Sequence, residues 1–115
     1  FSCAKQVKNK KVSLSAASAT KLYAVPSATT AIVKSMLVSD DAGSGDTITV
    51  TITDTSYVVV SLFQTKSISA NGTTELLTNP LILEESEILK VTAATANRLH
   101  VVLSTLEVQK RTVTT

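Results

Sequence analysis

The sequence has few of the residues that build catalytic or metal sites. Its 115 residues include one histidine, one cysteine and no tryptophan. A single cysteine excludes an intramolecular disulfide framework, and we interpret Cys3, near the terminus, as incidental. Cys3 and His100 lie at opposite ends of the sequence and cannot form a zinc site of recognised spacing. We therefore expect no metal, no cofactor and no catalytic residues.

Glycine and aromatic residues are also scarce. Three glycines are too few for a Gly-rich loop that could cradle a phosphate. Aromatic residues make up 3% of the chain, so basic residues are not interleaved with the stacking platforms that nucleic-acid binding requires. We expect no nucleic-acid partner and a core built from aliphatic side chains. The aromatic residues are Phe1, Tyr23, Tyr57 and Phe63.

Long apolar runs are absent as well. No segment approaches the roughly 18–20 apolar residues of a membrane span, so we expect no membrane partner. No charged segment followed by an apolar one opens the chain, so we expect no signal peptide within it. The length of 115 residues, with 43% hydrophobic and 17% charged residues, is typical of one globular domain, residues 1–115.

Threonine, serine and valine are the commonest residues, and their arrangement favours β-structure. The segment "DTITVTITD" (46–54) alternates a branched apolar residue with a threonine. Its Ile/Val row is expected to face a core and its Thr row to face water, as in a sheet solvated on one side. The segment "ILKVTA" (88–93) repeats the pattern, with Leu89, Val91 and Ala93 facing inward.

Strand-like segments recur at short spacing with turn residues between them, and no segment predicts a helix. This pattern indicates an all-β fold, a single antiparallel β-sandwich of 8–10 short strands with jelly-roll or Ig-like topology. The weakly patterned ends, 1–10 and 109–115, are interpreted as extended arms. The expected strands are 5–14, 20–25, 30–39, 46–54, 57–63, 65–69, 73–78, 81–84, 88–94 and 98–108.

Two segments depart from simple alternation. "RLHVVLSTLEV" (98–108) starts with Leu99, Val101 and Leu103 in one phase and continues with Leu106 and Val108 in the other, which predicts a bulge near Ser104. "YVVVSLF" (57–63) is apolar on both faces. We expect it to be either a central strand or a strand buried under a neighbouring subunit.

Charge is unevenly placed along the chain. Six lysines precede the first acid, Asp40. A lysine-bearing N-terminal arm could dock on an acidic partner or on nucleic acid, although lysines also keep an edge strand soluble. The four lysines that we assign to docking are Lys5, Lys8, Lys10 and Lys11.

The remaining polar groups offer weak candidates for chemistry. His100 alternates with Leu99 and Val101 and is expected on an outward face, as a surface histidine rather than a general base or ligand. Asp40, Asp41 and Asp46 lie in "DDAGSGD", which could hold calcium but lacks EF-hand spacing and is also ordinary loop composition. Consecutive acids in "EESE" (84–87) are typical of a solvated turn, and "NGT" (71–73) of a tight turn.

Two stretches resemble known proteins. "ATKLYAVPSATTAIVKSMLV" (19–38) and "NGTTELLTNPLILEESEILKVTAATANRLHVVLSTLEV" (71–108) are similar to segments of small β-sandwich structural proteins in virions of tailed bacteriophages. The resemblance covers most of residues 19–108. The first stretch carries the Leu-Tyr-x-Val-Pro opening, and the second carries the Asn-Pro-Leu turn and the final strands. Neither stretch contains a catalytic signature.

The resemblance implies a non-enzymatic virion component, most simply a capsid decoration (cement) subunit in the phage particle. Its partners would be the major capsid protein or other virion proteins, and copies of itself in a homo-oligomer, with a trimer favoured. A tail, neck or fibre component is the alternative within this class, and a carbohydrate-binding module the alternative outside it. For self-association we select Tyr57, Val59 and Phe63.

Overall fold

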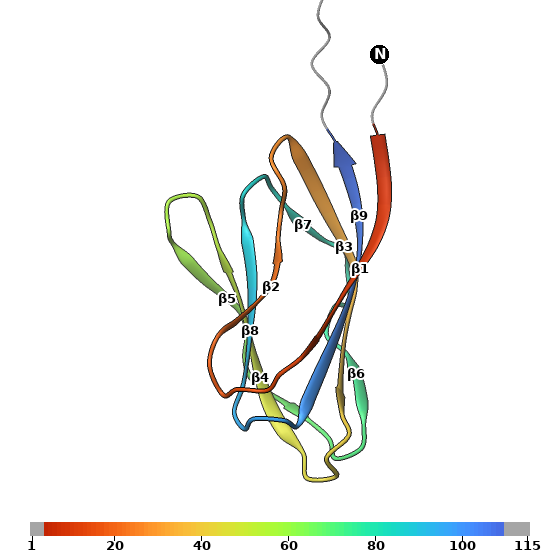
Figure 1. Ribbon diagram of the computed structural model, residues 1–115, viewed down its shortest axis with the longest axis vertical. Coiled ribbons are helices and arrows are strands. Elements are labelled where there is room, and N and C mark those ends of the chain that lie inside the picture. Colours follow the sequence, from red (N-terminus) through yellow and green to blue (C-terminus); the bar gives the residue numbers. More distant parts are fainter. Residues whose placement is uncertain (1–3, 110–115) are drawn as a thin grey trace, which may run out of the picture.

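The computed structural model describes residues 4–109, which form nine β-strands and no helix (Figure 1). No part of this range therefore meets the requirement for a membrane-spanning helix. The predicted strands 57–63 and 65–69 form one strand, β5. The strands are β1 (Ala4–Ser13), β2 (Thr20–Ala24), β3 (Thr29–Asp40), β4 (Asp46–Thr53), β5 (Val59–Ile68), β6 (Thr73–Glu75), β7 (Leu81–Leu83), β8 (Ile88–Ala93) and β9 (Leu99–Gln109).

Two antiparallel sheets pack face to face as a β-sandwich. The first sheet has the order β1-β9-β3-β6, and the short β7 also pairs with β3; the second has the order β2-β8-β4-β5. The chain changes sheet at every connection except β4–β5 and β6–β7. This alternation is the double Greek key of a jelly roll, which resolves the choice between jelly-roll and Ig-like topology.

The core between the sheets is aliphatic, as the composition predicts. Alternating residues of β4 and β8 point into it: Ile48, Val50, Leu89 and Val91 are fully buried. The threonines of β4 lie half-buried on the opposite face. The prediction that residues 46–54 place their Ile/Val row in the core and their Thr row on the opposite face is therefore confirmed. Successive side chains of a strand inside a sheet point to opposite faces.

The irregularity predicted near Ser104 lies in the neighbouring strand instead. The β3–β9 register shifts between Val33 and Ser35, opposite Ser104 and Thr105, so Lys34 is the extra residue. Strand β9 itself pairs with β1 without a shift and keeps one phase to its end. The expectation that Leu106 and Val108 turn inward is therefore wrong. Two polar residues, Thr105 and Glu107, face the interior in their place.

On the other side of β3, a side chain fills the gap between the residues that pair with β6 and those that pair with β7. The Glu75 carboxylate accepts the Met36 amide at 2.7 Å and the Leu77 amide at 3.2 Å, and it also accepts the Ser35 hydroxyl. Burial alone raises the pKa of Glu75, but these three hydrogen bonds outweigh it and lower the pKa below its usual value. At the end of β6 the Glu75 carboxylate therefore takes the place of the backbone carbonyl that a neighbouring strand would offer to the Met36 amide.

The segment 57–63 is not a central strand. Strand β5 is the edge of its sheet, next to β4 alone, so that half of the expectation is wrong. Residues 4–10, expected in an arm, pair with β9 from Ala4 to Lys10. Residues 1–3 and 110–115, including Phe1, Cys3 and the rest of the predicted arms, lie outside the described range.

Candidate contact surfaces and a buried polar cluster

The tip of the β4–β5 hairpin is the most apolar exposed segment of the described chain. Tyr57 is 88% exposed, and Val58, Val59 and Val60 are 53%, 60% and 51% exposed. Figure 1 shows this hairpin leaning away from the body of the sandwich. Val59 and Val60 are successive residues of β5 and point to opposite faces, so their exposure means that neither face of the tip is covered.

Local hydrogen bonds hold the hairpin turn in shape. The Asp54 carboxylate accepts the amides of Ser56 (2.9 Å) and Val58 (3.0 Å), and the Asp54 carbonyl accepts the Tyr57 amide at 3.0 Å. Tyr57 has a φ of 64°, in the left-handed region that a tyrosine rarely adopts. The turn therefore projects the Tyr57 ring outward from a constrained backbone.

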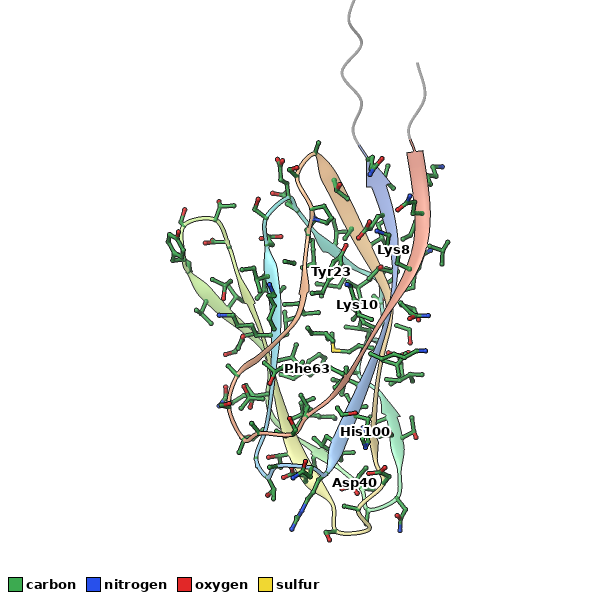
Figure 2. All side chains as sticks on the ribbon, in the orientation of Figure 1. Lys8, Lys10, Tyr23, Asp40, Phe63 and His100 are labelled. Atoms are coloured by element: carbon green, nitrogen blue, oxygen red, sulfur yellow. The ribbon has the colours of Figure 1, made fainter. Side chains whose placement is uncertain are left out.

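The rest of β5 is protected. Two register shifts separate the tip from the C-terminal half of the strand, and Thr65, with a φ of 48°, donates its amide to the Thr49 hydroxyl at 3.1 Å. Bulges and lysines such as Lys66 protect an edge strand from unwanted pairing. Phe63 packs against the core between the sheets (Figure 2). Of the three residues selected for self-association, Tyr57 and Val59 are together at the tip and Phe63 is apart.

The four docking lysines divide between the two faces of β1. Lys8 and Lys10 share the inward row with Val12, which packs against the core, whereas Lys5 and Lys11 share the outward row with Val7. The period of two in a strand produces this division, because Lys5 and Lys8 differ by an odd number of positions. The lysines therefore do not form one basic surface.

The outward face of the first sheet carries an apolar row. Val7 pairs with Leu106, Leu106 with Ile32, and Ile32 with Ile82, so these four side chains cross β1, β9, β3 and β7 in register. Val7 at one end is 85% exposed and Ile82 at the other is 63% exposed. Leu106 belongs to this row because β9 keeps one phase to its end.

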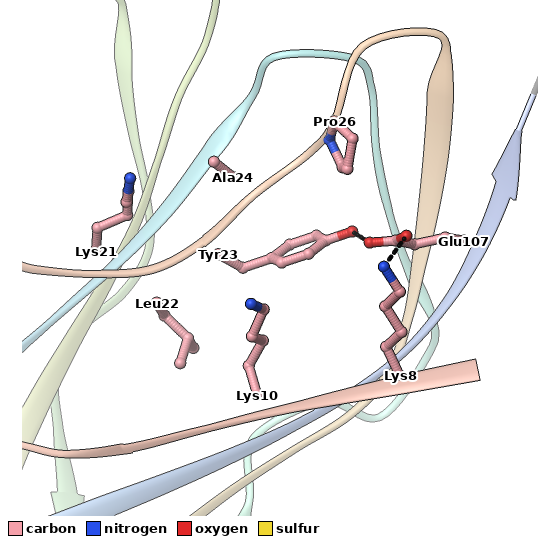
Figure 3. A pocket seen from close by; sticks show the side chains of 8 residues that line it. All are labelled: Lys8, Lys10, Lys21, Leu22, Tyr23, Ala24, Pro26 and Glu107. Carbon is pink, nitrogen blue, oxygen red and sulfur yellow. Dashed lines mark hydrogen bonds and ion pairs between the residues drawn. The ribbon is translucent and has the colours of Figure 1, made fainter. Parts of the chain in front are cut away.

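The inward lysines meet a polar cluster that sequence reasoning missed. Glu107 and Tyr23 are 2% and 3% exposed, and the Tyr23 hydroxyl donates to the Glu107 carboxylate. The Lys8 ammonium lies 3.1 Å from the other carboxylate oxygen (Figure 3). Glu107 is an even number of residues from the inward-facing Leu99. Its burial could therefore have been predicted from the sequence, but only if β9 was assumed to have no bulge.

The two ionisable groups of this cluster shift in opposite directions. Burial alone raises the pKa of Glu107, but the hydrogen bonds from Tyr23 and Lys8 and the charges of Lys8 and Lys10 lower it below its usual value. Burial, and then the hydrogen bond to Glu107 and its charge, raise the pKa of Tyr23 well above the usual value. At neutral pH the cluster is therefore an ionised glutamate bound by a neutral tyrosine and a lysine.

A pocket of about 230 Å³ opens over this cluster, between the inward face of β1 and strand β2. Lys10 reaches into it from β1 on the same side of the Tyr23 ring as Lys8, nearer to Leu22 (Figure 3). Its walls combine charged and apolar groups. The lining residues are Lys8, Lys10, Lys21, Leu22, Tyr23, Ala24, Pro26 and Glu107.

His100 lies on the outward face, as expected, and bridges two elements. Its Nδ1 is 2.9 Å from the Ser13 hydroxyl, and its Nε2 is 3.0 Å from the Asp41 carboxylate. The order Ser–His–Asp is that of a nucleophilic triad. The histidine and aspartate side chains are 38% and 68% exposed, however, and the adjacent Leu14 amide is bonded to the Leu99 carbonyl rather than free for an oxyanion. The contacts tie the Asp41 loop to β1 and β9.

Most carboxylates of the two acidic clusters accept backbone amides, although the buried Oδ2 of Asp40 has no hydrogen-bond partner among the described residues. Asp40 is buried and its Oδ1 accepts the amides of Ala42 (2.9 Å) and Gly43 (3.1 Å), while Asp46 accepts the Thr95 amide at 2.9 Å. No group of three or more His, Cys, Asp or Glu residues within 4–109 is arranged to hold a metal. At the β7–β8 turn, Glu85 accepts the Ala28 amide and Glu87 the Glu84 amide, both at 2.6 Å.

Comparison with known proteins identifies the fold but no family. No protein-family model and no curated protein matches the sequence. A solved chain from Bacillus endospore appendages, described as a novel family of disulfide-linked pili, is 12% identical, with a TM-score of 0.59 over 95% of this chain and 89% of that one. A chain of the cyanophage Pam1 capsid asymmetric unit is 15% identical, with a TM-score of 0.44 over 96% and 88%.

The first similarity shows a shared β-sandwich fold and, at 12% identity, nothing more specific. The second is too low to support an inference about this chain.

Proposed function

We propose that this protein is a non-enzymatic structural subunit that assembles in many copies through the tip of the β4–β5 hairpin. The observation that carries the proposal is the run Tyr57–Val60, four consecutive large hydrophobic residues that are each more than half exposed, in the turn and the first two residues of the edge strand β5. A contiguous exposed apolar patch on an unpaired edge favours association with another chain.

The choice of structural subunit over enzyme rests on what the polar groups do. In residues 4–109 the buried carboxylates accept hydrogen bonds from loop amides, a tyrosine and a lysine, all of which stabilise the fold. The best arranged triad, around His100, is exposed and lines an open pocket of about 290 Å³ at the sheet face. A rigid sandwich with apolar contact surfaces needs no further chemistry to serve in a repetitive assembly.

Within this class we propose a virion component, with capsid decoration as the specific role. The support is the resemblance of residues 19–38 and 71–108 to small phage structural proteins. The shared fold with a pilus subunit is compatible with this role and also with an extracellular appendage. Immunogold labelling of intact particles tests the location: label over the shell supports decoration, and label on the neck, tail or fibres, or none, contradicts it.

Association through the hairpin is tested by light scattering coupled to size-exclusion chromatography over a range of protein concentrations. The wild type is expected to form oligomers, with a trimer as the expected species. Val59→Lys places a charge in the exposed patch and should shift the protein to monomer. Because Val59 is already 60% exposed, the free energy of unfolding should change by less than about 0.5 kcal/mol.

Val7→Lys is the matched control, because Val7 is an exposed valine (85%, against 60% for Val59) on the outward face of the other sheet. It should leave the hairpin contact intact. A wild-type protein that stays monomeric at high concentration, or two variants with equal effects, would contradict association through the hairpin tip.

A further inference from the structure

The exposed hairpin tip is too small to form an interface with a second tip. Tyr57–Val60 are consecutive residues of one turn and strand, whereas each side of a standard protein–protein interface contributes about 20–30 residues and about 800 Å². Two tips packed only against each other would bury too little area for stable association. A concave surface elsewhere on a neighbouring copy can enclose a projecting tip and bury more of it.

The tip presents the Tyr57 ring on a constrained backbone. Tyr57 is 88% exposed at a φ of 64°, and the Asp54 carboxylate and carbonyl fix the backbone on both sides of it. A non-glycine residue in the left-handed region is costly, and such residues cluster at functional sites. A tyrosine held in one orientation loses little freedom on binding and buries a large ring. The ring is therefore preorganised to enter a pocket on another chain.

The pocket of about 230 Å³ between β1 and β2 has the chemistry that such a ring requires. Its wall includes apolar groups of Leu22, Ala24 and Pro26, and the Lys10 side chain reaches into it near Leu22 (Figure 3). A lysine ammonium near the face of an aromatic ring is attracted by the ring. An entering aromatic ring can thus contact the apolar wall and the ammonium group together.

The charges of the tip and of this pocket are complementary. The charged side chains that face the pocket from β1 and β9 are Lys8, Lys10 and Glu107, which leaves one positive charge in excess. Asp54 is the single charged residue of the segment 47–65, so the tip is negative. Complementary charges orient two surfaces and exclude wrong partners.

A second pocket, of about 290 Å³, is a poorer recipient for the tip. It opens around His100, which is paired with the Asp41 carboxylate, and that carboxylate would repel Asp54. The charge of the tip therefore favours the pocket between β1 and β2.

We propose that the hairpin tip of one copy docks in the pocket between β1 and β2 of the next copy, with the Tyr57 ring beside Lys10. The proposal rests on the proposed association through the hairpin tip and names the surface that receives it. Strands β2 and β5 are opposite edges of the second sheet, so the tip and the pocket lie on different sides of the molecule. A contact between unlike surfaces is heterologous, and repeated around an axis it closes a ring such as the expected trimer.

Light scattering coupled to size-exclusion chromatography of the full chain tests the pocket. Ala24→Arg fills the pocket from an exposed position and should shift the protein to monomer. Asn9→Arg is the matched control, because it adds the same charge at an exposed position on the outward face of β1, and it should leave the oligomer intact. Both variants should keep the wild-type melting temperature, since both positions are exposed.

A mixture of two defective variants distinguishes this contact from a contact between two tips. Val59→Lys has a defective tip and an intact pocket, and Ala24→Arg has the reverse. Each variant alone should be monomeric. An equimolar mixture, well above the concentration of half-maximal wild-type association, should form a dimer that cannot grow. Monomers in the mixture, or wild-type oligomers with Ala24→Arg, would overturn the proposal.

Two milder variants measure the contact of the ring itself. Tyr57→Asn removes the ring but suits the left-handed backbone, and it should weaken association at least about tenfold. Lys10→Gln should weaken association about two- to fivefold through loss of the ring–ammonium contact. Lys5→Gln, on the outward face of β1, is its control and should have no effect. An effect of Lys10→Gln no larger than that of Lys5→Gln would contradict the placement of the ring.

Failure of this docking contact and failure of hairpin association give different results. A wild-type protein that stays monomeric, or a Val59→Lys variant that associates normally, refutes association through the hairpin. A monomeric Val59→Lys variant together with a normally associating Ala24→Arg variant refutes only the pocket as the receiving surface.

Discussion

The two ends of the sandwich interior differ in chemistry although the same two strands, β3 and β9, cross both. On one side of the Lys34 bulge the facing inward residues are Met36, Val38, Leu103 and Val101, all fully buried aliphatic groups. On the other side, nearer the ends of the described chain, Thr105 and Glu107 face inward with Tyr23. The bulge marks where the inward side chains of β9 change from aliphatic to polar, while Ala31 and Val33 of β3 stay aliphatic.

The comparison shows that inward side chains at both ends are removed from water, but they can be either apolar or polar with hydrogen-bond partners. At the aliphatic end, removal of side chains from water stabilises the fold, at about 25 cal/mol per Å². At the polar end, Glu107 can be buried because a hydroxyl and an ammonium replace its water, and without them the cost would be several kcal/mol. The polar end is therefore specific about its partners and the aliphatic end is not.

The largest expected effect is at the aliphatic end. Leu103→Ala should lower the free energy of unfolding by about 2–5 kcal/mol, because the buried side chain leaves a cavity. Urea unfolding measures it. Leu106→Ala is the control in the same strand, with its side chain on the outward face, and should cost clearly less. Equal losses would mean that β9 changes phase after all.

The next largest effect is expected at the polar end. Glu107→Ala leaves the buried Tyr23 hydroxyl without its acceptor, and should lower the free energy of unfolding by roughly 1–3 kcal/mol. Glu84→Ala removes the same charge from an exposed turn and should stay within about 0.5 kcal/mol. If Glu107→Ala is as well tolerated as Glu84→Ala, the cluster does not stabilise the fold.

The smallest expected effect is a pH dependence of the free energy of unfolding, which distinguishes the polar end from the aliphatic end. The pKa of Glu107 is lower in the folded state than in the unfolded chain, where it is about 4.3. The unfolded chain then binds more protons between the two values, so the contribution of Glu107 is complete above about pH 4.3 and is lost as pH falls through the folded pKa. Urea unfolding between pH 7 and pH 3 should show this loss.

Two variants sharpen the pH prediction. Glu107→Gln should flatten the acid limb, and Glu75→Gln should flatten it further, since the pKa of Glu75 shifts in the same direction. Leu103→Ala should lower the whole curve without changing its slope. At the alkaline side the sign reverses: the raised pKa of Tyr23 stabilises the fold below its ordinary value of about 10, and this is lost as pH rises through the folded value.

The strands were predictable because alternation is a local property. In residues 46–54 and 88–93 the alternation of apolar and polar residues indicates which side faces the core, and both predictions are confirmed. The bulge was misplaced because two strands share it. Strand β3 contained the decisive signal, since its buried residues Ala31, Val33, Met36 and Val38 skip one position after Val33. The apolar residues of β9 suggest that its inward-facing row shifts by one residue, but the shift occurs in β3.

Contact surfaces were less predictable than strands. The segment 57–63 is apolar on both faces, and this pattern fits both a central strand and an exposed edge strand. Only the sheet order, in which β4 is the single neighbour of β5, shows that it is an edge strand. The Asn71–Gly72 turn was identified correctly as a turn, with Asn71 at a φ of 55°, but it joins strands of different sheets rather than a hairpin. Turn chemistry is local, whereas the partner of a strand is not.

The sequence by itself determined an all-β chain with an aliphatic interior, because alternation and β-branched side chains act over a few neighbouring residues. Only the tertiary structure decided that Glu107 is buried with Tyr23, that the lysines of β1 divide between two faces, and that Tyr57–Val60 is uncovered. The physical reason is that the environment of a side chain depends on the strand opposite it, and that strand is distant in the sequence: Tyr23 and Glu107 are 84 residues apart.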